Sequence, residues 1–465
     1  MAEVIIIGAG LTGLSAAYHL EKQQFFDYKI FDKQDRPGGL LRSVEQDGFT
    51  FDHTGHLLHI SDAYFREFLS TITSIDNLDL IARKAGIYSH NVITDYPFQI
   101  NLHGLPVEVA VECIEGYVTR SKHLKKPHNF HQWVLKHFGK GLGKHFLFPY
   151  NTKIYAYDLR KVHPAQGGRF VPSTNLAAII KGTIEKKPPT VGYNSSFYYP
   201  KKGGIEFIIR QIINQLISKI HTNHCVEHID TINKIVYFSN GHKEHYRRLI
   251  TTIPLNQLLT SLTPSSRNTL HQQSPKLIHN SVVNINMGFA ADTLPSLHWL
   301  YFPEKSFPLY RLGFWHNISP SSVPEGKTAT YGEFSYRPST TSKKQLEHKI
   351  DDAIKQTLAF LKLGNHHVVT QKILHIDHAY VIYNDWREKN VPKVLAQLQE
   401  LGIYSTGRYG EWKYSSMQEA VLDGKQAAEK VGTKGSRNLK EIMPAIRDHE
   451  TETIILKKKQ KSSTV

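Results

Sequence analysis

The sequence predicts an α/β fold: a Rossmann-like dinucleotide-binding domain carrying an inserted helical domain and a mixed β-sheet substrate domain. First, the apolar run at residues 3–7 leads into a glycine-rich loop, and a second apolar run, Tyr28–Phe31, ends at Asp32. This order is typical of a βαβ unit. Second, apolar residues recur at helical spacing from about residue 104 to 185, whereas strand-like runs dominate from about 190 to 400. Third, residues 404–430 return to a strand, a glycine turn and a helix.

These patterns divide the chain into six predicted segments. A chain of 465 residues is longer than one ordinary core requires. The dinucleotide-binding domain is predicted to use residues 1–100, 191–255 and 401–432, with a mainly helical insertion at 101–190, a β-rich substrate domain at 256–400 and a basic flexible tail at 433–465.

Positive charge is concentrated in one part of the chain. Lys and Arg number 57 against 41 Asp and Glu, and the span from Gly116 to Tyr157 has no acidic residue but eight Lys or Arg. A solvated helical face is the simplest interpretation, although such a field also attracts nucleotides, nucleic acid or an acidic membrane surface. No helix-turn-helix, RNP or zinc-finger pattern is present, so no nucleic-acid partner is expected.

The chain shows no targeting signal of its own. It has only two cysteines, Cys113 and Cys225, which indicates free thiols in a reducing compartment. No signal-peptide pattern precedes the first apolar run, and no apolar run approaches about 18 residues. We therefore expect a cytoplasmic protein without a transmembrane segment, and the Lys-rich end leaves a peripheral membrane contact open.

The first glycine loop predicts a site for a dinucleotide. Gly8-x-Gly10-x-x-Gly13 lets the backbone approach a pyrophosphate, and the helix that follows presents free N–H groups to it. Asp32 lies at the end of the second strand, nineteen residues after Gly13, where a carboxylate can accept both hydroxyls of an adenosine ribose.

A second glycine turn favours FAD over NAD as the cofactor. Gly38 and Gly39 follow the ribose carboxylate and let the chain pass beside a long cofactor, and Arg42 can reach its phosphates. Val226, on a later predicted strand, and the Gly407-Arg408 turn before the last helix complete the predicted site.

Three histidines, His53, His56 and His59, recur at three-residue spacing. This spacing could hold zinc or iron, but no cysteine or carboxylate lies nearby at ligand spacing. We therefore predict no metal, and expect a loop beside the flavin in which Gly55 and His56 lie at its ring.

Several ordered motifs resemble the UDP-galactopyranose mutase family in its eukaryotic-type form, within the amine oxidase and protoporphyrinogen oxidase-like flavoproteins. The similarity spans roughly residues 3–430. Its motifs are Gly48–His56, Tyr96-Pro97-Phe98-Gln99, Phe148–Lys153, Gly168-Arg169, Asn194–Pro200, Trp299–Arg311 and Gly407–Tyr414.

This resemblance implies a role for individual residues. The catalytic residues would be His56, Arg169, Arg311, Tyr301, Tyr380 and Tyr414. The cofactor-binding residues would be Gly8, Gly10, Gly13, Asp32, Gly38, Gly39, Arg42, Gly55, His56, Val226, Gly407, Arg408 and Gln418. The substrate-binding residues would be Tyr96, Phe98, Gln99, Asn151, Arg169, Asn194, Trp299, Tyr301, Arg311, Tyr380 and Tyr414.

The resemblance also implies a reaction. Reduced FAD would act through N5 as a nucleophile on the anomeric carbon of a UDP-sugar, interconverting its pyranose and furanose forms for cell-surface polysaccharide synthesis. The residue chemistry fits, because two arginines can neutralise a diphosphate and aromatic rings can stack on uracil and sugar. An external reductant would be needed to reduce the FAD.

Two positions depart from the family pattern and keep an alternative open. Ile318 stands where a diphosphate-binding Tyr is typical, and Gln418 where an Asn is usual. The alternative is an FAD-dependent oxidoreductase of the amine oxidase or protoporphyrinogen oxidase type.

Overall fold

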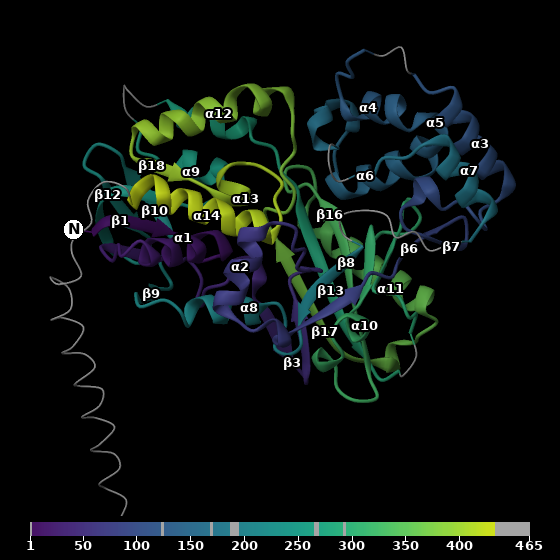
Figure 1. The fold of residues 1–465 in the computed structure, drawn as a ribbon, viewed down its shortest axis with the longest axis horizontal. Helices are drawn as coiled ribbons and strands as arrows, with labels where there is room; N and C mark the ends of the chain where they lie inside the picture. Colours follow the sequence, from purple (N-terminus) through teal and green to yellow (C-terminus); the bar gives the residue numbers. More distant parts are fainter. Residues whose placement is uncertain are drawn as a thin grey trace, which may run out of the picture.

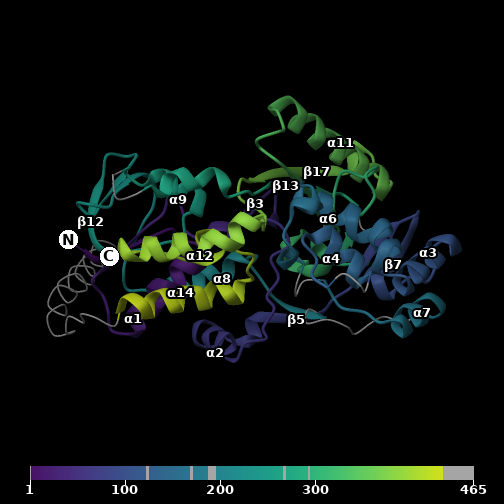
Figure 2. The same ribbon diagram turned by 90° about the horizontal axis from the view of Figure 1, so that it is seen from above.

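A computed structural model describes residues 2–121, 125–167, 171–186, 195–264, 269–291 and 294–432. Its helices and mixed sheets form three regions (Figures 1 and 2): a sheet between helices, a second sheet, and a helical unit beside the second sheet. The predicted α/β fold class is confirmed.

The first sheet has the order β10-β11-β12-β1-β2-β9, and β18 pairs with β12. Its strands are β1 (Ala2–Ile7), β2 (Tyr28–Phe31), β9 (Ile220–His221), β10 (Val226–Asp230), β11 (Ile235–Phe238), β12 (Lys243–Thr251) and β18 (Ile403–Ser405). β1 lies between β2 and β12 and runs parallel to both. Segments from the beginning, middle and end of the chain therefore build one sheet.

Helices cover both faces of this sheet. Val4 and Ile6 pack into the cluster that contains α1 (Leu11–Lys22), α8 (Glu206–Ile213) and α14 (Met417–Gly432). Ile5 and Ile7 pack on the other side with α9 (Leu255–Ser261) and α12 (Asp385–Glu400). Burial on both faces explains why β1 is continuously apolar.

The second sheet has the order β17-β13-β16-β15-β14-β6-β7. Its strands are β6 (Ala85–Ser89), β7 (Val92–Asp95), β13 (Ser281–Phe289), β14 (Trp299–Tyr301), β15 (Arg311–Phe314), β16 (Thr328–Tyr336) and β17 (Val368–Ile376). Apolar side chains on one face, such as Leu300, Leu312 and Ile285, pack against α11 (Lys343–Leu361). The alternate residues point to the opposite face.

The helical unit packs around its own apolar core. It comprises α3 (Val107–Val118), α4 (Phe130–His137), α5 (Gly139–Leu142), a π-helical turn (Gly143–Leu147), α6 (Phe148–Tyr155) and α7 (Leu176–Ile184). Glycines bring α3 and α5 into direct backbone contact, because a Cβ at Gly141 would lie 2.0 Å from the Glu112 carbonyl oxygen.

Short elements connect these regions. They are β3 (Ser43–Gln46), β4 (Phe49–Asp52), α2 (Ala63–Ile72), β5 (Leu78–Ala82), β8 (Ser196–Pro200), α10 (Trp315–Ile318) and α13 (Gly407–Gly410). β3 pairs with β4, and β5 pairs with β8. Within the described residues, no helix combines the length and the apolar character needed to cross a membrane.

Strands β6 and β7, and separately helix α12, differ in position from the predicted division of the chain. Strands β6 and β7 lie within residues 1–100, yet β6 pairs with β14 and both belong to the second sheet. Helix α12 lies within residues 256–400, yet Val391, Val394 and Leu398 pack on the first sheet. Both differences arise from long-range pairing and packing, which local sequence patterns do not encode.

Candidate active site

The first glycine loop packs too closely against its neighbours at the start of α1 for any side chain at Gly8 or Gly13. Gly8 has φ +97°, and a Cβ there would lie 2.1 Å from Thr252 Oγ1, while a Cβ at Gly13 would lie 1.8 Å from the Gly8 carbonyl oxygen. Helix α1 begins after Gly10 without a capping side chain. Its first N–H groups and its dipole therefore suit a phosphate group.

Asp32 is fixed next to this loop. The Ala9 N–H donates to Asp32 Oδ2 at 2.6 Å and the Gln34 N–H donates to Oδ1 at 2.8 Å, and the side chain is buried. These two bonds leave further lone pairs on the carboxylate for ribose hydroxyls.

The second glycine turn lies directly against the first. The Gly38 N–H donates to the Ala9 carbonyl at 2.8 Å, and a Cβ at Gly39 would lie 3.2 Å from Gly10 Cα. Arg42 Nε donates to the Gly39 carbonyl at 3.1 Å, which holds the guanidinium over the turn. The residues of both turns fit the adenosine and phosphate portion of FAD.

Two other predicted cofactor residues are Val226, on an edge strand of the first sheet, and Gln418, on α14. Val226 begins β10 and is half-buried. Gln418, in the first turn of α14, accepts hydrogen bonds through Oε1 from the Ser61 N–H at 2.9 Å and the Asp62 N–H at 2.8 Å. This side-chain oxygen therefore joins α14 to the start of α2.

The second sheet presents a polar and aromatic face opposite the one covered by α11. Across β14, β15 and β16, Tyr301 pairs with Arg311, and Arg311 pairs with Glu333. The next row aligns Trp299, Gly313 and Tyr331. Residues in register on neighbouring strands share a face, so this surface is built by strand alternation.

Arg311 is held in place by a buried carboxylate. Its Nε donates to Glu333 Oε2 at 3.0 Å and its Nη2 to Oε1 at 2.7 Å, and the Glu333 side chain is fully buried. A guanidinium has five N–H groups, so this bidentate pair leaves three for an anionic ligand.

An aromatic cluster lies beside Arg311. The Tyr301 ring centroid is 5.2 Å from that of Tyr96, 5.3 Å from that of Tyr150 and 6.4 Å from that of Trp299. Burial raises the pKa of the Tyr301 hydroxyl. The hydroxyl therefore stays protonated at neutral pH and can donate a hydrogen bond.

A second cluster surrounds Arg408. Its guanidinium carbon lies 4.4 Å from the ring centroid of Tyr414 and 5.7 Å from that of Tyr380, and these two rings are parallel. Burial raises the pKa of Tyr380, and the charges of both Arg311 and Arg408 oppose that rise. Tyr380 therefore lies within electrostatic reach of both arginines.

His56 connects the glycine-rich half of the site with the second sheet. Burial lowers the pKa of His56 to about 3, and Arg408, His53 and Arg311 act in the same direction. The imidazole is therefore neutral at physiological pH. Its neighbour Gly55 lies against Tyr331, because a Cβ there would be 2.4 Å from the Tyr331 hydroxyl.

The three spaced histidines do not converge on one point. His53 Nδ1 bonds to the Arg42 carbonyl at 2.8 Å, whereas His59 Nδ1 bonds to the Ser196 carbonyl at 3.3 Å. Within the part of the chain that the structure describes, no group of three His, Cys, Asp or Glu side chains is arranged to hold a metal ion.

Other predicted substrate residues lie under the aromatic cluster rather than in it. Phe98 and Gln99 are buried, and Gln99 Nε2 donates to the Pro172 carbonyl at 2.6 Å. Asn151 Nδ2 donates to the carbonyl of Leu147, the residue before α6. Arg169 and Asn194 lie outside the described residues, so their predicted roles stay predictions.

Ile318 belongs to the apolar core. It is 1% exposed and packs in the cluster that includes Trp315 and Tyr331. This position, where the resembling family has a diphosphate-binding Tyr, therefore contributes packing behind Tyr331.

Sequence reasoning assigned no role to three residues that shape this site. Glu333 pairs with Arg311, and Tyr150 joins the aromatic cluster. Lys153 Nζ lies 2.5–3.0 Å from the carbonyl oxygens of residues 302, 304, 307 and 309, which share its N–H donors. Lys153 thereby fixes the loop that leads into Arg311. A signal was available for Glu333, which is the one charged residue in the strand sequence TATYGEFSY.

Three buried polar atoms on this face lack a hydrogen-bond partner among the described residues: Tyr331 Oη, Asn284 Oδ1 and Asn286 Nδ2. Buried polar groups are normally paired, so their convergence is typical of a surface that binds a polar ligand. The face lies against the Gly55–His56 loop, because a Cβ at Gly55 would meet the Tyr331 hydroxyl.

A family model for flavin-containing amine oxidoreductases matches residues 11–432. The chain belongs to this family. Membership confirms the predicted superfamily and implies a flavin cofactor, FAD, which the two glycine turns and Asp32 suit. The protein is therefore a flavin-dependent enzyme.

Solved structures and curated relatives of this enzyme point to different activities. A reduced UDP-galactopyranose mutase matches with a TM-score of 0.86 and 27% identity, over 94% of this chain and 95% of that one. A putative protoporphyrinogen oxidase from Exiguobacterium sp. 255-15 matches with a TM-score of 0.71 and 17% identity, over 93% and 99% of the two chains, and shares the fold.

The curated relatives match only short segments. Coproporphyrinogen III oxidase from Staphylococcus aureus (strain NCTC 8325 / PS 47) is 48% identical over 50 residues, which is 10% of this chain and 11% of the relative. A 4,4'-diapophytoene desaturase from S. aureus (strain COL) is 37% identical over 62 residues, 13% of this chain and 12% of the relative.

Proposed function

We propose that this enzyme is a UDP-galactopyranose mutase-like isomerase that interconverts the pyranose and furanose forms of a UDP-sugar with reduced FAD. The observation that carries the proposal is the Tyr301–Arg311–Glu333 row facing the His56 loop. The match to the mutase structure over nearly the whole of both chains supports it.

The proposed roles follow from the geometry of the two clusters. Arg311 presents its free N–H groups to the diphosphate, while Glu333 keeps the guanidinium from turning away. The protonated hydroxyls of Tyr301 and Tyr380 donate to phosphate oxygens and stabilise the charge that develops as the diphosphate leaves. Arg169 is proposed as a second diphosphate ligand.

The aromatic rings are proposed to position the two ends of the substrate. Tyr96 offers a face to the uracil, and Trp299 and Tyr301 form a wall beside the sugar. This placement holds the anomeric carbon against the flavin end of the site.

Bound FAD in its reduced form supplies the nucleophilic and electronic chemistry of the reaction. Neutral His56 and Gly55 are proposed to orient its ring, while Arg408 provides positive charge nearby. An external electron donor would set the redox state before turnover.

The second candidate is an FAD-dependent oxidoreductase. Membership in the amine oxidoreductase family and the names of the curated relatives favour it. The buried arginine on the sheet face argues for an anionic substrate, which disfavours an amine or a carotenoid but not a porphyrinogen with its carboxylates.

Product analysis tests the proposal. The purified holoenzyme is incubated with UDP-galactofuranose after dithionite reduction, and the nucleotides are separated by chromatography. We expect UDP-galactopyranose only in the reduced sample. No conversion, together with substrate-dependent consumption of O₂ in a screen of amines and porphyrinogens, would favour the second candidate.

A further inference from the structure

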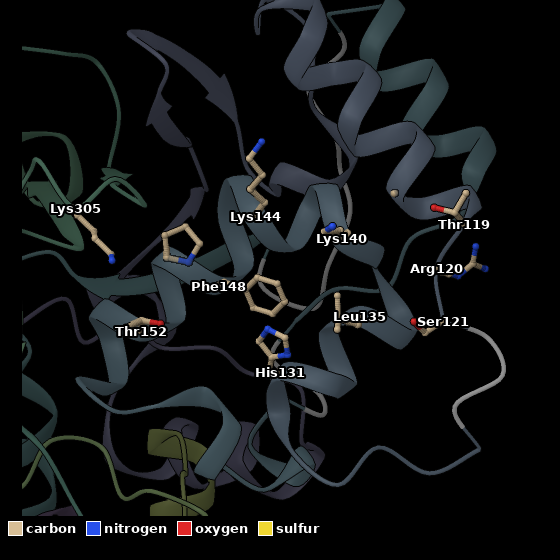
Figure 3. Close-up of a pocket in the computed structure, with 12 residues that line it drawn as sticks. Thr119, Arg120, Ser121, His131, Leu135, Lys140, Lys144, Phe148, Thr152 and Lys305 are labelled. Carbon is tan, nitrogen blue, oxygen red and sulfur yellow. The ribbon is translucent and has the colours of Figure 1, made fainter.

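A basic cavity in the helical unit is separate from the site described above (Figure 3). Its volume is about 740 Å³. The lining combines residues 116, 119–121, 131, 135, 140, 144, 148, 149 and 152 of the helical unit with Lys305 from the loop between β14 and β15. A volume of this size accommodates a small organic ligand.

The lining carries positive charge that is only partly neutralised. Arg120, Lys140, Lys144 and Lys305 all line the cavity, and none of its lining residues is acidic. Lys144 pairs with Glu112 at 2.6 Å, whereas no ion pair of Lys140 or Lys305 occurs among the described residues. The acid-free sequence span thus yields a concave surface of one charge, which attracts anions.

Close helix packing fixes the walls of this cavity. A Cβ at Gly116 would lie 2.4 Å from the Gly141 nitrogen, and a Cβ at Gly143 would lie 2.5 Å from the Phe148 ring. α3, α5 and the start of α6 are therefore in van der Waals contact. Lys140 and Lys144 therefore lie on a preformed helical scaffold, whereas Arg120 follows the end of α3 and Lys305 lies on the loop after β14.

Two stacked rings lie in the middle of the cavity wall. The rings of His131 and Phe148 are 4.3 Å apart at 9°. In Figure 3, Thr152 and Lys305 lie toward one end of these rings and Arg120 toward the other. The lining thus combines a planar aromatic surface, hydroxyl groups and cations.

We propose that this cavity is a second nucleotide site, distinct from the active site. Phosphate groups would contact Lys140 with Arg120 or Lys305, and the base would pack against the His131–Phe148 pair. Charge-assisted bonds bind phosphate strongly, and base–aromatic stacking is tolerant of base identity.

Helix α6 separates this cavity from the aromatic cluster of the active site. Phe148, Pro149 and Thr152 line the cavity, whereas Tyr150 packs against Tyr301 on the other side. The two sites share a wall but no lining residue, so variants can address them independently.

Equilibrium dialysis of the FAD-loaded, full-length protein with radiolabelled ADP tests the site. Lys140→Glu reverses one lining charge and is expected to weaken binding at least about tenfold, since one charge-assisted bond contributes that much. The matched control is Lys136→Glu, which changes the net charge equally on neighbouring α4 but lies outside the lining. It is expected to change binding less than twofold.

Two further comparisons identify the ligand class and the location. ADP is expected to bind about tenfold more tightly than pyrophosphate, because pyrophosphate lacks a base to stack. Arg311→Lys alters the proposed active site and is expected to leave unchanged the ADP binding that Lys140→Glu weakens. The test of the cavity therefore stands even if the proposed function fails.

Several outcomes would overturn the nucleotide site. They are absence of saturable ADP binding, equal loss in both Glu variants, equal affinity for ADP and pyrophosphate, or loss of all ADP binding in Arg311→Lys. Sedimentation with phosphatidylserine vesicles completes the test. Vesicle binding that Lys140→Glu and Lys136→Glu weaken equally, without ADP binding, would show that the basic face serves a membrane surface instead.

Discussion

Replacing Arg311 by Met should destabilise the protein through Glu333. The substitution removes both N–H donors from a carboxylate that is fully buried. Breaking a buried ion pair from one side typically costs about 3–5 kcal/mol.

Urea unfolding followed by circular dichroism measures this effect. We expect the free energy of unfolding of Arg311→Met to be lower than that of the parent by about 3–5 kcal/mol at pH 7.

The double variant Arg311→Met/Glu333→Gln provides the control. Removing the carboxylate charge should restore most of the lost stability while turnover stays low by about 10²–10³-fold, as expected for a lost transition-state contact. A single-variant cost below about 1 kcal/mol would refute the buried-pair reasoning. Recovery of turnover in the double variant would remove Arg311 from the proposed diphosphate site.

Three further predictions concern the cofactor loop, the arginine loop and acid stability. Gly10→Val should fold yet bind no FAD, because the valine side chain would fill the space through which the loop approaches the phosphates. Gly10→Ala should keep its flavin absorbance, because the nearest atom to a Cβ at this position is 3.8 Å away. Flavin retained by the Val variant would contradict the assignment of this loop to the cofactor site. Lys153→Met should free the 302–309 loop and lower kcat at least tenfold with flavin still bound, because four backbone carbonyls lose the donor that they share. An unchanged kcat would show that this loop does not position Arg311. Burial lowers the pKa of His298 to about 4, and its Nδ1 accepts a hydrogen bond from the Lys84 N–H, so acid should favour the unfolded chain below pH 6.5. When urea unfolding is measured at pH 7.5 and again at pH 5, the free energy of unfolding of His298→Asn should therefore rise by about 2 kcal/mol relative to that of the parent. An unchanged difference between the two proteins would contradict a buried neutral imidazole.

The parts of the fold that local patterns encode could be predicted from the sequence. The β1–glycine–α1 unit and strand β2 follow from apolar runs, glycine spacing and a terminal carboxylate, and β2 spans the predicted Tyr28–Phe31. The helical insertion was visible from its apolar periodicity. These features depend on residues that are close together in the sequence, so a single amino-acid sequence is enough to predict them.

Features that depend on strand register could not be predicted. Arg311 and Glu333 are partners because β15 and β16 align in one register, which a single sequence does not specify. The pairing of β6 with β14 joins segments about two hundred residues apart. The hydrogen bonds from Lys153 to the carbonyls of the 302–309 loop likewise depend on the packing of α6 beside that loop, which joins residues far apart in the sequence.

The redox state of the flavin during turnover tests the central claim most directly. Under anaerobic conditions, the reduced holoenzyme is mixed with an excess of UDP-galactofuranose while flavin absorbance and product are recorded together. The proposed isomerase should convert many equivalents of substrate with the flavin still reduced at the end and no further reductant consumed. Oxidation of the flavin in proportion to product, or product formed only by the oxidised enzyme, would contradict it.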